Sequence, residues 1–434
     1  MAAPLEGIVV VDFTEYVAGP YCTMMLADMG AEVLKVEPFE GDHWRRQQPV
    51  AGRESRYYIG VNRGKKSIAL RLETPEGRAI AHDLVRRADV VVTNYRPGLP
   101  EQLGLDYETL AGLRPGLIYA ALSAFGPQGP YSGRPGFDLL VQAMSGIMDF
   151  ERKVERGVPV GITSFAPADL STGMFTAYAI AAALFMRERS GLGQKIDTSL
   201  FASAIAIQYR PTLAIESLDR ENREALLGAV EAARDSGASY EDLFEFRTGL
   251  GLGRATAMYY RVFRTRDSLI CVACLNNRQR RGLRDALGVD DPAVDGHVYE
   301  LGAAITPEDH LALMASYEGA FLRKTTAEWL TALEAADVPC VPVVLSEEVF
   351  DHPQVAANGL IQTLRHPVVG TIRQPGAPVW MSNAEVGRHV PAPAFSAHAR
   401  ETLRSIGYGD DEIASLEARG IVQPPAVAPD GARS

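Results

Sequence analysis

The stretch that decides the fold lies near the start of the chain, where residues 8–37 read IVVVDFTEYVAGPYCTMMLADMGAEVLKVE. Ile8–Phe13 is a run rich in β-branched residues, typical of a strand buried on both faces. Pro20 then opens a helix, because proline fits the first helical position, and Gly30 ends it. Glu32–Glu37 forms the next strand. A helix between two strands is the crossover that parallel pairing requires, so this stretch predicts a β-α-β unit.

The same alternation continues along the chain. Further strands are predicted at 67–72, 89–93 and 117–123, and Thr74 is the N-cap of a helix between the first two of them. Four or five strands that alternate with helices predict an α/β fold with a doubly wound sheet.

The character of the sequence changes near Gly249. A hairpin at 259–274 and helices up to Ala336 predict a smaller α+β domain. The expected organisation is a large α/β domain formed by 1–212 and 336–422, a helical connector or insertion at 213–247, a small domain at 248–335, and a disordered Pro/Ala-rich tail at 423–434.

Composition excludes several classes of protein. The 434 residues carry 43 Lys and Arg against 54 Asp and Glu, a formal charge of −11, which disfavours a nucleic-acid partner. Four cysteines cannot form a disulfide scaffold, so a cytoplasmic location is expected. The N-terminus lacks the basic segment of a secretory signal. The longest weakly polar stretch, Met174–Met186, is shorter than the roughly 20 residues that span a bilayer, so we expect a core helix over Ser171–Arg189 and no membrane association.

Dinucleotide and metal sites find little support in the sequence. The loop after the first strand reads Ala18-Gly19-Pro20 instead of GxGxxG, and no clear strand precedes the glycines at 249–253. Cys271 and Cys274 have CxxC spacing but fall within a predicted strand, where their side chains would point to opposite faces. No metal is therefore expected.

Asp169 is the residue most typical of a catalytic group. It follows a proline turn and directly precedes the apolar helix, whose N-terminus would keep a carboxylate ionised in a partly dry site. The alternative is an ordinary N-cap aspartate. A basic cluster near the strand ends suggests a phosphate-bearing ligand, with solvated surface charge as the alternative. Its members are Lys35, Arg45, Arg46, Lys65, Lys66 and Arg71.

Eight segments in order carry a further signal. They are VVDFTEYVAGPYCTMMLADMGAEVLKVEP (10–38), NRGKKSIALRLETPEGR (62–78), ADVVVTNYRPG (88–98), PGFDLLVQAMSG (135–146), ADLSTGMF (168–175), GLGQKIDTSL (191–200), TTAEWLTALEAADVPCVPV (325–343) and DHPQVAANGL (351–360). The set resembles the family III CoA-transferases, the group of formyl-CoA transferase and carnitine CoA-transferase. The resemblance extends to about residue 420 and is weakest over 213–246. It implies a Rossmann-like large domain, a small domain, and a homodimer of two interlocked subunits.

The resemblance also implies a mechanism and a site. Asp169 would be the nucleophile that attacks an acyl-CoA and passes through aspartyl anhydride and aspartyl-CoA thioester intermediates. The substrates would be acyl-CoA and carboxylic acids, with no tightly bound cofactor. The glycines of a flexible loop would be Gly249, Gly251 and Gly253. The implied CoA contacts are Val17, Ala18, Leu70, Arg71, Leu72, Glu73, Asn94, Tyr95, Arg96, Phe137 and Asp138.

Departures from the family pattern bear on specificity. Formyl-CoA transferase has Gln at the position of Val17, so its substrates do not carry over, and Pro38 and Glu73 replace basic residues that would grip adenine. Arg71 or Arg45 could take that part. Val17 and Phe137 suggest an apolar wall that is compatible with succinyl-CoA as donor and a larger or aromatic acceptor.

Two other functions stay open at this point. Related acyl-CoA racemases have His where this chain has Phe137, and phenylalanine cannot carry a proton, which disfavours a two-base racemase. The third alternative is a CoA-binding protein without turnover.

Overall fold

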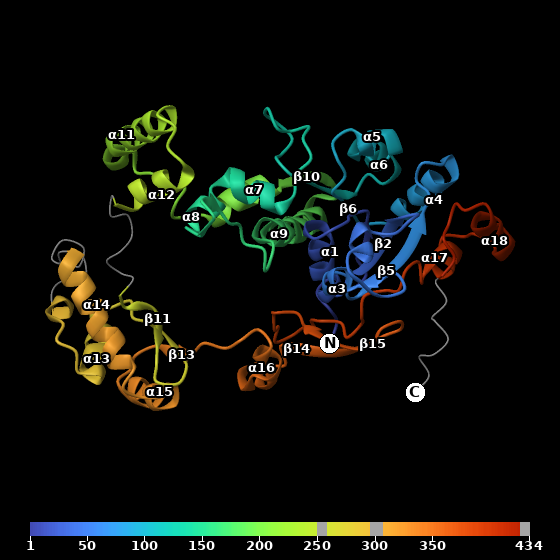
Figure 1. Ribbon diagram of the computed structural model, residues 1–434. Helices are drawn as coiled ribbons and strands as arrows, with labels where there is room; N and C mark the ends of the chain where they lie inside the picture. Colours follow the sequence, from blue (N-terminus) through green and yellow to red (C-terminus); the bar gives the residue numbers. More distant parts are fainter. Residues whose placement is uncertain (250–257, 296–306, 426–434) are drawn as a thin grey trace. The chain divides into compact units, whose positions relative to one another are not determined.

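A computed structural model describes residues 1–249, 258–295 and 307–425 (Figure 1). The chain divides into two compact units. Unit 1 contains residues 1–229 and those from 357 onwards, and unit 2 contains residues 230–356. These limits differ from the boundaries at 213, 248 and 336 expected from the sequence.

The centre of unit 1 is a six-stranded sheet in the order β10-β7-β6-β1-β2-β5. All of its neighbouring strands are parallel. The strands are β1 Val9–Asp12, β2 Glu32–Pro38, β5 Lys65–Leu70, β6 Val90–Thr93, β7 Ile118–Ser123 and β10 Gln194–Ser199. The predicted α/β fold is confirmed. The edge strand β10 was not predicted, because Ile196 is its one large apolar residue and its side chains are mostly outside the core.

The first β-α-β unit has the form predicted from residues 8–37. β1 pairs in parallel with β2, with Val10 opposite Val33. The helix between them, α1, spans Ala18–Asp28 and therefore begins two residues before Pro20, with Val17 as its N-cap. Its N-terminus lies directly after the loop that leaves β1.

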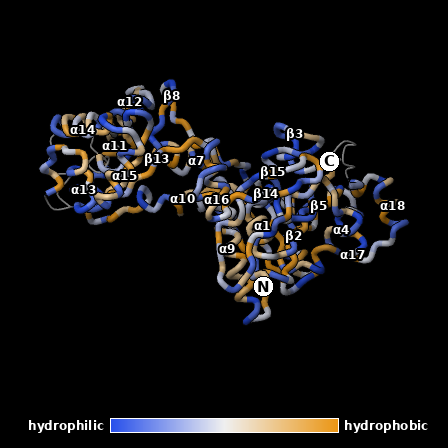
Figure 2. The backbone as a smooth tube through the Cα atoms, turned by 90° about the horizontal axis from the view of Figure 1, so that it is seen from below, coloured by the Kyte–Doolittle hydropathy of each residue, from blue (hydrophilic) through white to orange (hydrophobic). Residues whose placement is uncertain are grey.

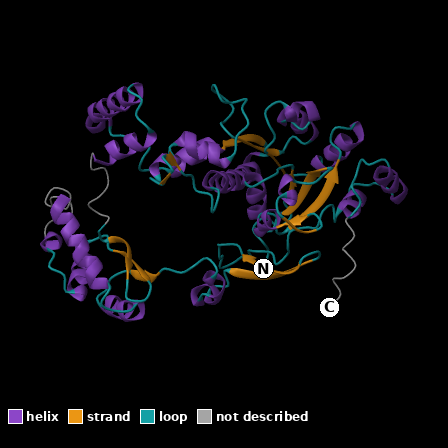
Figure 3. Cartoon of the chain, in the orientation of Figure 1, coloured by secondary structure: helices purple, strands orange, loops and turns teal. Residues whose placement is uncertain are grey.

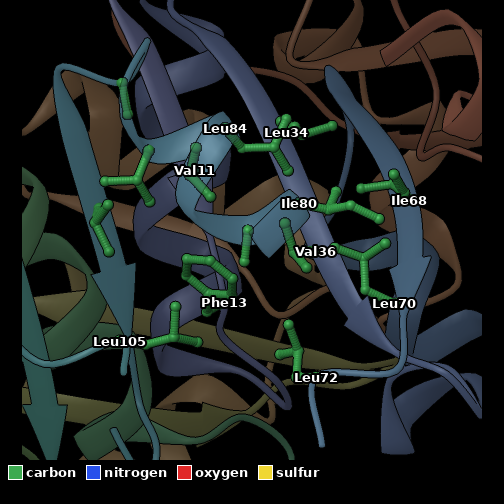
Figure 4. Packing of buried hydrophobic residues seen from close by; sticks show 14 of the residues in the cluster. Val11, Phe13, Leu34, Val36, Ile68, Leu70, Leu72, Ile80, Leu84 and Leu105 are labelled. Carbon is green, nitrogen blue, oxygen red and sulfur yellow. The ribbon is translucent and has the colours of Figure 1, made fainter. Parts of the chain in front are cut away.

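Helices cover both faces of the sheet. On one face, Ile80 and Leu84 of α4 (Pro75–Val85) pack on side chains of β1, β2 and β5, as Figure 4 shows. The same core includes residues of α6 (Tyr107–Leu113), α17 (Ala399–Ser405) and α18 (Asp410–Ala418). The other face is covered by α1, α7 (Asp138–Ser145), α9 (Pro167–Ser190) and α10 (Leu200–Ile207). This is the doubly wound arrangement.

The helix α9 is long and apolar. In the part of the chain that the structure describes, it is the one helix whose length and composition would allow it to cross a membrane. Of its most apolar 18-residue stretch, 44% is buried. Ile180 and Leu184 lie in the core of unit 1, whereas Tyr178 and Phe185 on another side of the helix are exposed. It begins at Pro167, four residues earlier than predicted.

Unit 2 contains an antiparallel sheet in the order β11-β12-β13. Its strands are β11 Tyr260–Arg264, β12 Leu269–Ala273 and β13 Cys340–Pro342, and the predicted hairpin is confirmed by the β11–β12 pairing. β13 pairs with β12, so residues 340–342 complete the sheet of unit 2, whereas the sequence placed them in the return to the large domain. The helices that pack here are α13 Asn277–Leu287, η1 Pro292–Asp295, α14 Pro307–Phe321 and α15 Thr326–Ala335.

The expected connector is helical. It contains α11 (Glu216–Asp235) and α12 (Tyr240–Gly249). No residue of α11 is buried, and hydrophilic and hydrophobic residues are mixed along it (Figure 2).

Short elements complete the chain, and Figure 3 shows them among the loops. They are α2 His43–Arg46, β3 Pro49–Ala51, β4 Glu54–Ser55, α3 Arg56–Gly60, α5 Leu99–Leu103, α8 Ile147–Phe150, β8 Val154–Glu155, β9 Val158–Pro159, η2 Glu348–Asp351, α16 Pro353–Ala357, β14 Ile361–His366 and β15 Gly370–Pro375. Gln423, which the sequence placed in a disordered tail, donates its backbone N–H to Ala69 O and its side-chain amide to Phe39 O.

Candidate active site

A cavity of about 290 Å³ opens in unit 1 where the strand order reverses. The neighbours of β1 are β2 and β6, and parallel sheets bind ligands at such a switch point, beyond the carboxyl ends of the strands. The cavity brings together seven of the residues expected from the sequence. They are Val17, Ala18, Asn94, Tyr95, Arg96, Phe137 and Asp169.

Asp169 lies in the first turn of α9, two residues after Pro167. Its own backbone N–H and that of Ala168 donate to Oδ1 of Asp138, at 3.1 and 2.7 Å. Asp138 therefore caps the helix from another element, because no side-chain cap comes from Ala166 at the N-cap position. The interpretation of Asp169 as an ordinary N-cap residue is wrong.

The carboxyl group of Asp169 is held in an unusual electrostatic environment. Burial raises its pKa to about 7, and the nearby carboxylate of Asp138 acts in the same direction. The sequence predicted an ionised carboxylate at the helix N-terminus. That effect is outweighed here, because Asp138 brings a negative charge to this helix end and accepts its free N–H groups. No hydrogen bond or ion pair of the Asp169 side chain is present within the described residues.

Close packing of two helices sets the position of Asp169. Gly173, one turn further along α9, lies against α1 so tightly that a Cβ there would come within 2.8 Å of the carbonyl oxygen of Ala18. A glycine at this position lets α9 approach the residues that follow β1. The nucleophile expected from the sequence and the start of α1 therefore share one cavity.

Buried charges fix the loop between β1 and α1. Lys35 Nζ donates to Thr14 O at 2.5 Å and pairs with Asp42 at 3.0 Å, with both side chains fully buried. Asn94 bonds both backbone groups of Glu15, accepting from its N–H at 3.0 Å and donating to its C=O at 2.7 Å. The loop therefore presents Val17 and Ala18 from a rigid support.

Five of the expected CoA contacts do not line the cavity. Leu70 and Leu72 are buried in the core, Arg71 donates to Gly420 O at 2.8 Å, and Glu73 is exposed. Leu70 ends β5 and the other three follow it, two strands away from β1 along the carboxyl edge of the sheet. The fifth, Asp138, holds the backbone of Asp169.

Three members of the basic cluster are not free to bind phosphate. The side chains of Lys35, Lys65 and Arg45 are at most 1% exposed. Lys35 pairs with Asp42, and Lys65 pairs with Asp12. Arg45 pairs with both Glu37 and Glu54. The hypothesis of an anion-binding cluster is wrong for these three residues. A sequence shows that cations are close to strand ends, but it does not show that acidic residues of neighbouring strands neutralise them.

The expected glycine loop lies mostly beyond the described part of the chain. Gly249 is the last residue of α12, whereas Gly251 and Gly253 lie outside the described residues.

Several cavity residues were missed by sequence reasoning. Tyr16, His43, Arg134 and Leu200 are among them. His43 binds Glu15, with Nδ1 at 2.9 Å from Oε1, so an imidazole is present in the cavity although position 137 carries phenylalanine. His43 is not part of a histidine motif, so the sequence contained no signal for its place in the site. Arg134 could have been identified, because it lies within three residues of Phe137 in a Gly/Pro-rich loop.

Comparison with known proteins now decides the family. The model of CoA-transferase family III matches residues 5–399. The chain belongs to CoA-transferase family III. The predicted resemblance is confirmed, and this family III CoA-transferase is an enzyme that moves CoA between acyl-CoAs and acids.

Its relatives cover nearly the whole chain. The family III enzyme is 33% identical over 423 residues to the succinyl-CoA:glutarate CoA-transferase of Mus musculus, covering 97% of this chain and 90% of the relative. It is 34% identical over 422 residues to the enzyme of the same name from Homo sapiens, covering 96% and 90%. A crystal structure of a CaiB/BaiF family protein from Brucella suis matches with a TM-score of 0.72 at 29% identity, over 94% of this chain and 100% of that one.

Proposed function

We propose that Asp169 is the nucleophile of a CoA transfer from a dicarboxylyl-CoA, such as succinyl-CoA, to a carboxylic acid. The carboxylate attacks the thioester carbonyl, and CoA thiolate leaves as an aspartyl anhydride forms. The thiolate then attacks the aspartyl carbonyl, giving an aspartyl-CoA thioester and free donor acid. The acceptor carboxylate displaces the thiolate to form a second anhydride, and the returning thiolate releases acceptor acyl-CoA and restores Asp169. The activation of the acyl group is retained at each step.

One observation carries this proposal: Asp169 lines the switch-point cavity with no internal side-chain partner in the described residues. Asp169 is half-buried, and because most buried polar side-chain atoms have a hydrogen-bond partner, a carboxyl group without one is unusual at this position. A carboxyl group left available in a cavity beside a helix N-terminus suits attack on a substrate.

The rest of the cavity fits anionic substrates. Arg96 and Arg134 line it, and neither has a carboxylate partner within the described residues. A guanidinium group binds phosphate or carboxylate oxygens in a bidentate manner. We assign CoA to the carboxyl edge of the sheet, from Asp169 past Arg96 towards Arg71, and the distal carboxylate of the donor to the cavity. The two mammalian relatives, named for succinyl-CoA and glutarate, support dicarboxylic substrates.

We also propose that two subunits interlock and act in the cytoplasm. Large apolar side chains lie exposed on the elements around the site, such as Leu140 of α7 and Tyr178 and Phe185 of α9, and a partner subunit would cover them. The four cysteines are all free thiols, which suits a reducing compartment. Native mass spectrometry should give about 94 kDa, twice the chain mass of 47.0 kDa.

Trapping with hydroxylamine tests the nucleophile. The protein is incubated with succinyl-CoA and hydroxylamine, digested, and analysed by peptide mass. An anhydride or thioester at Asp169 would be converted to a hydroxamate on the peptide that contains this residue. Asp169→Asn should give neither hydroxamate nor transfer, while Asp149→Asn, which changes an aspartate outside the cavity lining, should give both.

Two results would contradict the proposal. An unmodified Asp169 with several acyl-CoA donors would exclude the nucleophile. Incorporation of deuterium at the α-carbon of an acyl-CoA in D₂O, without exchange of CoA between acids, would favour the racemase instead.

A further inference from the structure

Tyr16, in the loop between β1 and α1, has a strained backbone conformation. Its φ angle is +67°, a conformation that a tyrosine rarely adopts. Its N–H donates to Oδ1 of Asp42 at 3.4 Å, and Asp42 is held by Lys35. Backbone strain that the surrounding structure maintains is most common where it serves function.

The strained backbone places the Tyr16 ring among other rings. It lies edge-on to Phe137, with 5.4 Å between centroids and 72° between planes, and stacks on His43 at 5.4 Å and 15°. Trp44 contacts it edge-on at 5.7 Å and in turn stacks on Tyr57 at 4.8 Å. Tyr16, His43 and Phe137 line the cavity with Asp169, whereas Trp44 and Tyr57 do not.

The rings of Tyr16 and Phe137 line the same cavity as the carboxyl group of Asp169. Phe137 directly precedes Asp138, whose carboxylate binds the backbone N–H of Asp169. Phe137 and Asp169 line the same cavity, so an acyl group attached to Asp169 shares this cavity with Phe137, which is 53% exposed although its side chain is large and apolar. Burial raises the pKa of the Tyr16 hydroxyl, and the carboxylates of Glu15 and Asp42 act in the same direction, so the ring stays neutral.

We infer that Tyr16 is a specificity-determining residue, whose ring forms with Phe137 an aromatic corner that selects acids with a flat, aromatic or unsaturated body over saturated acids of the same size. A flat body stacks on one ring and meets the edge or face of the other, whereas a puckered ring fits neither geometry. The inference rests on the proposed function only in taking the bound ligand to be a carboxylic acid.

Benzoate and cyclohexanecarboxylate are a matched pair for the test, since they differ mainly in the flatness of the ring. Their dissociation constants are measured by calorimetry on the CoA-saturated enzyme, which needs no turnover. Wild type should bind benzoate about 2- to 10-fold more tightly, the usual range for an aromatic pair. Tyr16→Leu should bring the ratio close to one, and Tyr16→Phe should preserve it.

Two further variants make the test specific. Phe137→Leu changes the other ring, which stands on unstrained extended backbone with φ −130°, and should abolish the preference as well. Tyr57→Leu removes a ring of the same cluster that lies outside the cavity, and should leave the preference intact. The inference is overturned by equal affinities in wild type, by no binding of either acid, or by a ratio that survives either Tyr16→Leu or Phe137→Leu. Loss of hydroxylamine trapping with an intact ratio would instead count against Asp169 as nucleophile.

Discussion

The side chain of Asp138 holds the backbone of Asp169, accepting its N–H at 3.1 Å, and its negative charge also opposes ionisation of the Asp169 side chain. One residue thus performs two opposing tasks at the start of α9. It satisfies the helix N-terminus and fixes the position of the reacting group, and it makes that group harder to deprotonate. Gln142 donates to the second oxygen of Asp138, so the cap is itself held in place.

The rate of acylation should therefore depend on pH with an acidic limb near 7. The nucleophile must be ionised, and the pKa of Asp169 is raised to about 7. Below this pH the ionised fraction falls about tenfold per unit, and above it the rate should level off. Rapid-quench measurement of succinate release from succinyl-CoA, without acceptor and between pH 5 and 9, gives the profile.

Asp138→Asn should move that limb to lower pH. The amide oxygen can still accept the N–H of Asp169, while the repelling charge is gone. We expect a shift of about one pH unit, with activity at pH 8 retained within about threefold. A limb that stays in place would show that Asp138 has no electrostatic effect on Asp169. Asp138→Ala removes the cap as well, and should cost about 1 kcal/mol of unfolding free energy.

Asp169→Asn should be inactive yet more stable than wild type at pH 8. Folding raises the pKa of this carboxyl group from 3.8 to about 7, so the folded state gains stability from the neutral group at low pH and loses that gain as pH rises through 7. The full shift is worth at most about 4 kcal/mol, and partial exposure reduces the expected gain of the variant to about 1–3 kcal/mol. Urea unfolding at pH 8 and at pH 3.5 measures it, since the difference should vanish below pH 3.8. A variant as stable as wild type at pH 8 would contradict the raised pKa.

The fold was predictable because its decisive signals are local. Ile8–Phe13 is apolar on both faces, as a central parallel strand must be, and Thr74 caps its helix through its own side chain. β10 carries no such signal. As an edge strand it needs few apolar residues, and its six backbone pairings with β7 come from tertiary structure alone.

The sequence predicted those residues of the candidate site that belong to a recognisable local pattern or motif. Asp169 was found from its place between a proline turn and an apolar helix, and then from the family resemblance, whereas Phe137 was found from the resemblance alone. Tyr16 and His43 were not, because their role depends on the loop conformation and on ring contacts between residues 27 and 121 positions apart. The cap of α9 was not found either, since Asp138 reaches it across 31 residues.

Gly173 should be intolerant of any side chain. A Cβ would lie 2.8 Å from Ala18 O and 3.1 Å from the ring of Tyr21, so α9 would have to move away from α1. A shift of about 1 Å at Asp169 can reduce the rate about 100-fold. Steady-state kinetics of Gly173→Ala should show a fall mainly in kcat. Gly228→Ala, on exposed α11 with open space around the glycine, is the control and should behave as wild type. Unchanged activity in Gly173→Ala would show that the helix contact does not position Asp169.

Lys65 and Lys66 are adjacent in sequence but should respond very differently to removal of their charge. Lys65 is buried and donates to Asp12, Asn62 and the carbonyl of Pro20, at 3.0, 2.8 and 2.9 Å. Lys65→Met would leave the carboxylate of Asp12 buried without this partner, and breaking a buried pair costs about 3–5 kcal/mol. Lys66 is 37% exposed and pairs with Glu32 and Glu401 at the surface, so Lys66→Met should cost less than about 1 kcal/mol. Urea unfolding of the two variants measures the contrast. Suppose instead that Lys66→Met weakened CoA binding and that Lys65→Met were as stable as wild type. The basic cluster would then be a ligand site. The buried ion pair with Asp12 would not be what keeps Lys65 beneath the loop that leads to the cavity.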